Sequence, residues 1–445
     1  MPQALSSETF FSTWQHALQS DFAKDGQPAT YFPGHPKHWG KETARIDRDV
    51  EGSLVLSLSD DGSLLGISNA NGEVRIYDVP SFTLWRTLRG PRSPFGRSVE
   101  FQPSHGKSGM VLIGGGLVQG TKRREWIKSY ELKNDDETED LLEQAANVAA
   151  LAAVETISKD VSRENIDYTK IRDGFYDALF GNQLEMRKGD VFEGSLVGGR
   201  TFSRDGSFFL FGKERNTIVV LDSESSQERY KLIGHTDYVV WAETSPDDTV
   251  IATSSWDQTV RVWDATNGQQ LRVLTGATNQ SWSGAFSPDG RLVCAGCGGS
   301  KVRVWDVESG ELLHTLGGFQ RWARSVAFSP DGKSLAGGSG GGVLKVFDVA
   351  SGKEKQHWEV KKADPFGNTF IEIHSAYYTP KGLLVFKYGD GRVHTYNEET
   401  NQKGLYEHGP EIPSSAGYGT KLVTPDGKLL ISADFDGRVR IWSLE

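Results

Sequence analysis

The sequence predicts an all-β fold in which small sheets are arranged radially around a common axis. The first observation is a regular spacing: Asp222, Asp264, Asp306 and Asp348 stand 42 residues apart, each at the end of a short apolar strand. The second is that these strands share one pattern, reading TIVVLD, TVRVWD, KVRVWD and VLKVFD. A fixed period in the forties with an aromatic–Asp ending is typical of a radial array of sheets. Such an array presents a surface and says little about chemistry.

The best-formed unit runs from Gly234 to Asp264 and divides into alternating strands. Turn residues separate these strands at 246–248 and 256–258. This unit resembles the WD40 repeat, which has a Gly-His start and a Trp-Asp end. The resemblance implies a β-propeller, in which four-stranded blades surround a central channel.

The same resemblance assigns four side chains of this unit to the hydrogen-bonded tetrad of the family: His235, Asp257, Trp263 and a strand hydroxyl, either Thr253 or Ser255. A buried His–Asp pair that is satisfied by an indole and a hydroxyl holds a blade together, so a structural role is expected rather than a catalytic one. The next two units carry Gly299 and Gly341 at the tetrad Asp position, so their blades are expected to depend on packing.

Eight strands match the third-strand pattern, which predicts an eight-bladed ring, with seven blades as the alternative. They end at Asp78, Leu132, Asp222, Asp264, Asp306, Asp348, Asn397 and Ser443. The chain stops just after the last of these strands, so the outer strand of that blade must come from elsewhere. Residues 43–49 align with the outer strand that begins at Leu271 and are expected to supply it. The propeller is therefore predicted to span residues 43–445.

Two segments interrupt the repeats. Residues 1–42 contain too many aromatic side chains for a disordered tail, so they are expected to pack on the ring, with a partner-binding arm as the alternative. Residues 134–188 begin with acids and continue as an Ala/Leu-rich run, which favours helix. This acidic insertion is predicted between the third and fourth strands of the second blade, either as a decoration packed on that blade or as a second docking element.

Composition limits the classes of partner. The formal net charge is −10, and residues 134–188 hold 13 acids and 6 bases, which gives that segment −7. This balance disfavours direct nucleic-acid binding, which needs cations against phosphates. Cys294 and Cys297 lie on a predicted strand and have no second pair to complete a zinc site. No run is apolar enough for a membrane span and no signal peptide is evident, so a cytoplasmic or nuclear location is expected.

The resemblance also indicates where a partner would dock. In WD40-like propellers the top face is formed by the loops before the first strand and between the second and third strands. The residues that map there are rich in the types that dominate interface hot spots. They are Tyr238, Trp256, Trp282, Trp322, Arg324, Phe95, Arg97, His374, Tyr418 and Phe435. We expect a protein or peptide partner there, with an acidic or carbonyl group facing Arg324.

The sequence shows no catalytic constellation. No nucleophile–base pair, phosphate loop or metal-ligand cluster is evident, so no cofactor or metal is expected. The glycine clusters at 114–116 and 337–342 are expected at turns between second and third strands. The predicted function is a non-enzymatic scaffold or adaptor subunit of a larger assembly. The alternative is a dedicated chaperone for a basic client, such as a ribosomal protein or a histone, with the acidic insertion as a charge lure.

Overall fold

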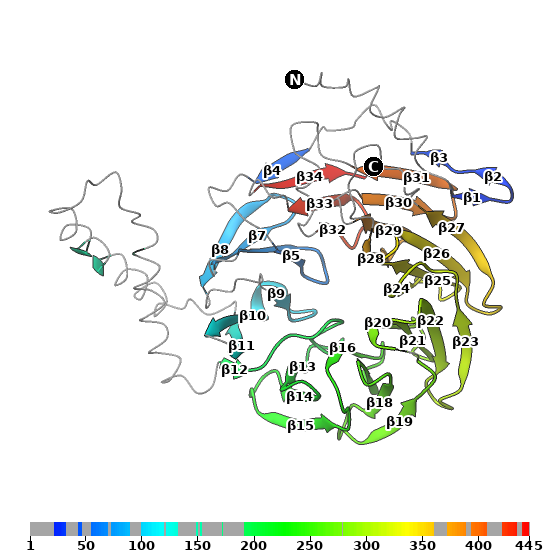
Figure 1. Cartoon of the computed structure of the whole chain (residues 1–445). Coiled ribbons are helices and arrows are strands. Elements are labelled where there is room, and N and C mark those ends of the chain that lie inside the picture. The colour runs from blue at the N-terminus through cyan, green and yellow to red at the C-terminus, as the bar shows by residue number, and fades with distance from the viewer. Residues whose placement is uncertain are drawn as a thin grey trace.

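The computed structural model consists of small antiparallel sheets placed one after another around a ring (Figure 1). The described residues are 22–32, 43–46, 55–69, 73–89, 99–119, 122–131, 148–149, 152–153, 171, 191–277, 279–359, 372–388, 393–406, 421–433 and 438–444. Within them almost every regular element is a strand, so the all-β prediction is confirmed. None of their helical stretches is long and apolar enough to span a membrane.

The first four sheets follow one another in chain order. The first sheet contains β5 Val55–Leu58, β6 Leu64–Ser68, β7 Glu73–Asp78 and β8 Thr83–Arg89, and the second contains β9 Val99–Phe101, β10 Met110–Gln119, β11 Lys122–Glu131 and β12 Val191–Glu193. The third sheet contains β13 Phe208–Lys213, β14 Thr217–Asp222 and β15 Glu228–Ile233, and the fourth contains β16 Val239–Thr244, β17 Val250–Ser255, β18 Val260–Asp264 and β19 Gln270–Leu274. A short 3-10 turn, η1 Gly106–Ser108, precedes β10.

The next four sheets continue around the ring. The fifth sheet contains β20 Ser281–Phe286, β21 Leu292–Cys297, β22 Lys301–Asp306 and β23 Leu312–Leu316, and the sixth contains β24 Ala323–Phe328, β25 Ser334–Ser339, β26 Val343–Asp348 and β27 Glu354–Glu359. The seventh sheet contains β28 Ile373–Tyr378, β29 Leu383–Tyr388, β30 Val393–Asn397, β31 Gln402–Tyr406 and β3 Thr30–Tyr31, and the eighth contains β32 Lys421–Val423, β33 Leu429–Ala433, β34 Val439–Ser443 and β4 Ala44–Ile46. A separate hairpin pairs β1 Ala23–Lys24 with β2 Gln27–Pro28.

The core lies between neighbouring sheets. Successive residues of a strand point to opposite faces, so each sheet contributes apolar side chains to both of its neighbours. In β17, for example, Ile251 packs toward the preceding sheet and Ala252 toward the following one. Among the described residues this produces eight buried clusters, each shared by two adjacent sheets. One of them joins the last sheet to the first through Ile441 and Leu56.

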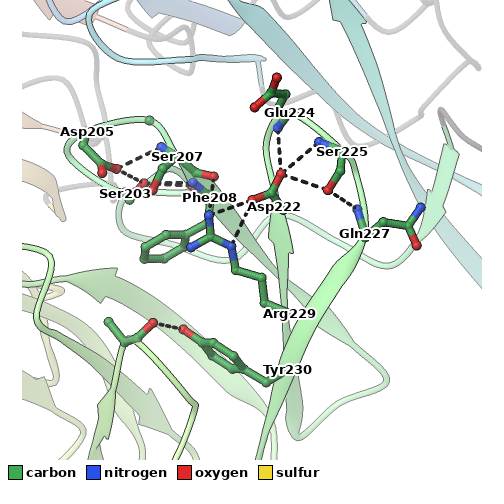
Figure 2. Close-up of polar contacts among 12 residues, drawn as sticks. Ser203, Asp205, Ser207, Phe208, Asp222, Glu224, Ser225, Gln227, Arg229 and Tyr230 are labelled. Carbon is green, nitrogen blue, oxygen red and sulfur yellow. Dashed lines mark hydrogen bonds and ion pairs between the residues drawn. The ribbon is translucent and has the colours of Figure 1, made fainter.

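Two recurring aspartates cap turns in several of the repeats, and Figure 2 shows both in the β13–β15 sheet. Before β13, Ser203 Oγ donates to Asp205 Oδ1 at 2.8 Å, and the same Ser–Asp contact recurs in the SPDG turns. After β14, Asp222 Oδ1 accepts from the Ser225 N–H at 2.9 Å. Hydrogen bonds from Ser225 and Arg229 lower the pKa of Asp222 to about 2. The 42-residue spacing therefore repeats a turn-capping carboxylate.

The two ends of the chain meet in the last sheet. β4 pairs with β34, with Ile46 opposite Val439, so residues 44–46 of the expected stretch supply the outer strand there. Thr43 Oγ1 also donates to the Ile441 carbonyl at 3.0 Å. In Figure 1 the blue β4 lies beside the red β34. Residues 47–49 lie outside the described part of the chain.

The N-terminal extension adds to a different sheet. β3 pairs in parallel with β31 and gives that sheet a fifth strand, a pairing that sequence analysis did not anticipate. The aromatic N-terminal segment also predicts a short helix near residues 8–22, and these residues lie almost wholly outside the described part of the chain. The acidic insertion separates β11 from β12, and of its residues only 148–149, 152–153 and 171 are described, all of them helical.

One turn prediction is wrong. Gly114–Gly116 lie inside β10, where they pair with Ile127, Trp126 and Glu125 of β11. A Cβ at Gly114 would press on Leu196, so close packing across the sheet face favours glycine there. The other cluster does include the predicted turn, since residues 340–342 connect β25 to β26.

Candidate functional site

The tetrad residues meet in the sheet formed by β16–β19. His235 Nδ1 lies 2.8 Å from Asp257 Oδ2, and His235 Nε2 lies 2.7 Å from Thr253 Oγ1. Trp263 Nε1 donates to the same Thr253 hydroxyl at 2.9 Å. Thr253 is therefore the hydroxyl that joins the imidazole to the indole. Ser255 Oγ instead donates to the Asp237 carbonyl, in the loop that precedes β16.

Asp257 is also tied to its own turn. Its carboxylate accepts the Thr236 N–H at 3.1 Å and the Thr259 hydroxyl at 2.7 Å. Burial acts to raise the pKa of Asp257, but hydrogen bonds from His235 and Thr259 outweigh it and hold that pKa well below its usual value. Both side chains of the His–Asp pair are almost fully buried, at 2% and 4% exposed. A closed pair of this kind stabilises the blade and offers no access to a substrate.

Four aromatic side chains form a continuous row across the β16–β19, β20–β23 and β24–β27 sheets. We call Tyr238, Trp256, Trp282 and Trp322 the aromatic row. Their successive ring centroids are 5.4, 5.5 and 6.2 Å apart, with the rings tilted against one another. All four side chains are half-buried, so each ring packs on its neighbours and keeps part of its surface in solvent. Tilted rings at this spacing attract one another, which adds to the free energy gained by burying their apolar area.

Arg324 lies at one end of the aromatic row. Its guanidinium carbon is 5.7 Å from the Trp282 ring centroid and 5.4 Å from that of Trp322. Arg324 Nη1 donates to Glu372 Oε2 at 3.0 Å, and the two side chains are 31% and 17% exposed. The acidic group that we expected a partner to bring is thus present within the chain. Glu372 was missed because it precedes β28 and belongs to no repeat motif.

Three donors in this region have no hydrogen-bond partner in the described structure. They are Trp256 Nε1, Trp322 Nε1 and Arg324 Nε, each buried. Buried donors are usually paired, and leaving one unpaired costs free energy. The aromatic row therefore combines apolar ring surface with unsatisfied donors, while Glu372 balances the charge of Arg324.

A second set of charged side chains forms ion pairs between segments that are far apart in the sequence. Arg200 donates two hydrogen bonds, of 2.7 and 3.2 Å, to the Asp60 carboxylate. Arg204 Nη2 donates to Glu243 Oε1 at 2.8 Å. Burial raises the pKa of Glu100 to about 7, with Arg200 lowering that pKa and Asp60 raising it. Within the described part of the chain, no group of three His, Cys, Asp or Glu side chains could hold a metal ion.

Comparison with known families decides the class of the repeats. The model of the family "WD domain, G-beta repeat" matches residues 226–264, 268–306, 310–348 and 414–443. The chain contains WD40 repeats. No curated protein matches it.

The WD40 repeats at 268–306 and 310–348 match although their tetrads are incomplete. In the first of them Trp305 Nε1 donates to the Thr275 carbonyl at 2.9 Å. A backbone carbonyl therefore accepts the indole N–H that a hydroxyl accepts in a complete tetrad. Cys294 and Cys297 of this repeat are free and buried, and burial raises the pKa of both thiols.

The structure brings five of the ten predicted partner-binding residues together, namely the aromatic row and Arg324. Phe95, Arg97, Tyr418 and Phe435 lie outside the described part of the chain, and so does the side chain of His374 in β28. The predicted site is therefore described over three adjacent sheets.

Proposed function

We propose that this WD40-repeat protein is a non-enzymatic interaction scaffold or adaptor subunit, built as one closed ring of eight blades. The eight clusters between neighbouring sheets support the blade count, because the last cluster connects the final sheet back to the first. The strand β4 supports ring closure, because it pairs the N-terminal side of the ring with the last blade. The two buried free thiols are compatible with the proposed cytoplasmic or nuclear location.

The aromatic row carries this proposal. Half-buried Trp and Tyr rings are already ordered, so a partner that covers them loses little side-chain entropy and buries a large apolar area. Because Glu372 already neutralises Arg324, the partner segment needs apolar side chains more than it needs acidic ones.

The test is a comparison of captured partners. Tagged wild-type chain and the double variant Trp322→Ala/Arg324→Ala are used to capture partners, which are then quantified by mass spectrometry. A partner docked on the aromatic row should bind the double variant by tens-fold more weakly, a cost of roughly 2 kcal/mol at a hot spot. The control is Leu84→Ala, which removes an exposed apolar side chain from β8, on another sheet. Equal capture by all three proteins would refute docking on the aromatic row.

The acidic insertion supports a second candidate, a chaperone for a basic client. Its charge of −7 would attract a cationic protein through long-range electrostatics. Such binding should weaken steeply as salt is raised from 50 to 500 mM, because exposed charges are screened over shorter distances (about 10 Å at 0.1 M). Binding to the aromatic row should change little over that range.

A further inference from the structure

The N-terminal segment, residues 22–32, lies along the outer edge of the β28–β31 sheet. β3 extends that sheet in parallel, with Thr30 opposite Gln402 and Tyr31 opposite Lys403. The Thr30 N–H donates to the Asn401 carbonyl at 3.1 Å, and the Phe32 N–H donates to the Lys403 carbonyl at 3.0 Å. These bonds satisfy an edge that would otherwise present unpaired backbone groups. In Figure 1 the blue β1, β2 and β3 lie beside the orange β31.

A single aromatic anchor fixes the start of this segment. Phe22 is 1% exposed and stacks on Tyr396 at a centroid distance of 4.1 Å with an interplanar angle of 7°. The Trp358 ring lies 5.0 Å away on the neighbouring sheet, and Phe386 meets Phe22 edge-on at 5.9 Å. The pocket is therefore built by two sheets and filled by a residue that belongs to neither.

Side chains of the ring also bind the backbone of the segment. Gln356 accepts the Ala23 N–H at 3.2 Å and donates to the Ala23 carbonyl. Asn401 Nδ2 donates to the carbonyls of Gln27 and Pro28 at 3.1 and 3.4 Å. These contacts bind main-chain atoms and would be offered equally to another sequence in the same conformation.

Strand addition at a sheet edge, combined with a pocket for one anchoring side chain, is a recurrent way in which proteins bind extended peptides. We propose that this edge and the Phe22 pocket form a peptide-binding site for a partner's extended segment with a Phe or Tyr anchor, and that the chain's own residues 22–32 occupy it in competition with that partner. The site is separate from the aromatic row, so it does not depend on the function proposed above.

Two observations support exchange of the bound segment. The β3–β31 pairing covers only two residues, which is a short ladder to break. The anchor also leaves the pocket incompletely filled: a cavity of about 10 Å³ is lined by Phe22, Trp358 and Gly404, among others. Trp358 Nε1 is buried and has no hydrogen-bond partner among the described residues, so a hydroxyl-bearing anchor would gain a contact that Phe22 lacks.

The experiment uses the full-length chain with Phe22→Ala, which empties the pocket, and a fluorescent peptide with the sequence of residues 20–34. Fluorescence anisotropy should show the peptide binding to this variant. The same peptide with Ala at position 22 should bind at least about tenfold more weakly, because the anchor is lost. Wild-type chain should also bind the peptide at least about tenfold more weakly than the variant, because its own segment occupies the site at high effective concentration. Lys333→Ala, an exposed substitution far along the chain, should behave as wild type.

Three results would overturn the proposal. The first is a Phe22→Ala chain that melts like wild type but binds no peptide, and the second is equal binding of the Phe and Ala peptides. The third is a dimer of the chain formed by exchange of residues 22–32, detected by light scattering, which would assign the edge to a second copy. If Phe22→Ala does not fold, competition is tested instead by hydrogen exchange of isotopically labelled wild-type chain in the presence of excess unlabelled peptide. Faster exchange at residues 22–32 supports competition, and unchanged exchange refutes it.

Discussion

At the scale of single residues, one shared hydroxyl, that of Thr253, joins the His235 imidazole to the Trp263 indole. The tetrad could be assigned from the Gly-His and Trp-Asp ends of one unit, and only the choice between Thr253 and Ser255 needed coordinates. Both hydroxyls lie on the same strand two residues apart, so alternation alone could not separate them. Glu372 and Gln356 were not predictable, because each contacts a residue far away in sequence and lies outside any repeated motif.

We expect Asp257→Ala to lower the free energy of unfolding by about 1–3 kcal/mol, because the buried His235 imidazole and the half-buried Thr259 hydroxyl lose their acceptor. Urea unfolding followed by tryptophan fluorescence measures the loss. Glu224→Ala, at an exposed turn, should stay within about 0.5 kcal/mol of wild type. Loss of partner capture at an unchanged melting temperature would contradict the structural role of Asp257.

Glu100 gives a prediction about pH. The pKa of Glu100 in the folded chain, about 7, lies above the ordinary value of 4.5. The protonated side chain therefore stabilises the folded state below pH 4.5, and this stabilisation is lost as the pH rises through 7. Glu100→Gln should therefore be more stable than wild type at pH 8, by on the order of 1–2 kcal/mol once the partial exposure of the side chain is allowed for, and similar to it at pH 4.5. Urea midpoints at the two pH values measure this difference. A parallel loss of stability in both proteins between pH 4.5 and 8 would count against it, and exposed Glu308→Gln is the control.

At the scale of elements, strands with a repeated Asp ending were located from sequence and the irregular elements were not. The β13–β15 sheet has three named strands, and its inner position is taken by a segment held through isolated bridges at Ser195, Gly198 and Phe202. This segment has no alternating apolar pattern that would predict a strand. Its pairing depends instead on glycine backbone that lies close to β16. Gly198 exchanges hydrogen bonds with the backbone of Val240 and Ala242 at 3.0 and 2.9 Å.

Gly199→Ala tests that close approach. Gly199 has φ +99°, and a Cβ there would collide with the Ala242 carbonyl oxygen, so we expect a loss of roughly 2–3 kcal/mol in the free energy of unfolding. Gly382→Ala is a matched control, since its φ is +80° but no atom lies within 4 Å of the added Cβ. It should cost only the backbone strain, about 1 kcal/mol. Equal losses in the two variants, measured by chemical denaturation, would show that crowding at Gly199 is unimportant.

At the scale of the whole molecule, the repeat period predicts the number of similar strands, and the similarity of residues 43–49 to an outer strand predicts how the array closes. A strand count works because the turn after most third strands is capped by the Asp that ends the strand, so the pattern survives even where the tetrad is lost. The parallel addition of β3 could not be predicted in this way. Its pairing depends on backbone groups of β31, which any sequence carries, and on a pocket assembled from two sheets.

Ring closure by β4 gives the last prediction. Deleting residues 43–49 removes the outer strand of the last sheet and takes Ile46 out of the cluster that joins the last sheet to the first. Losing one such buried side chain costs on the order of 3 kcal/mol, and the unpaired edge of β34 adds to it. The control replaces 43–49 with the sequence of 271–277, which puts the buried Leu274 at the position of Ile46. This chimera should recover most of the stability, because the ring needs an outer strand with an apolar residue there and does not need the native sequence. If the deletion variant unfolds at the same urea concentration as wild type, β4 does not close the ring.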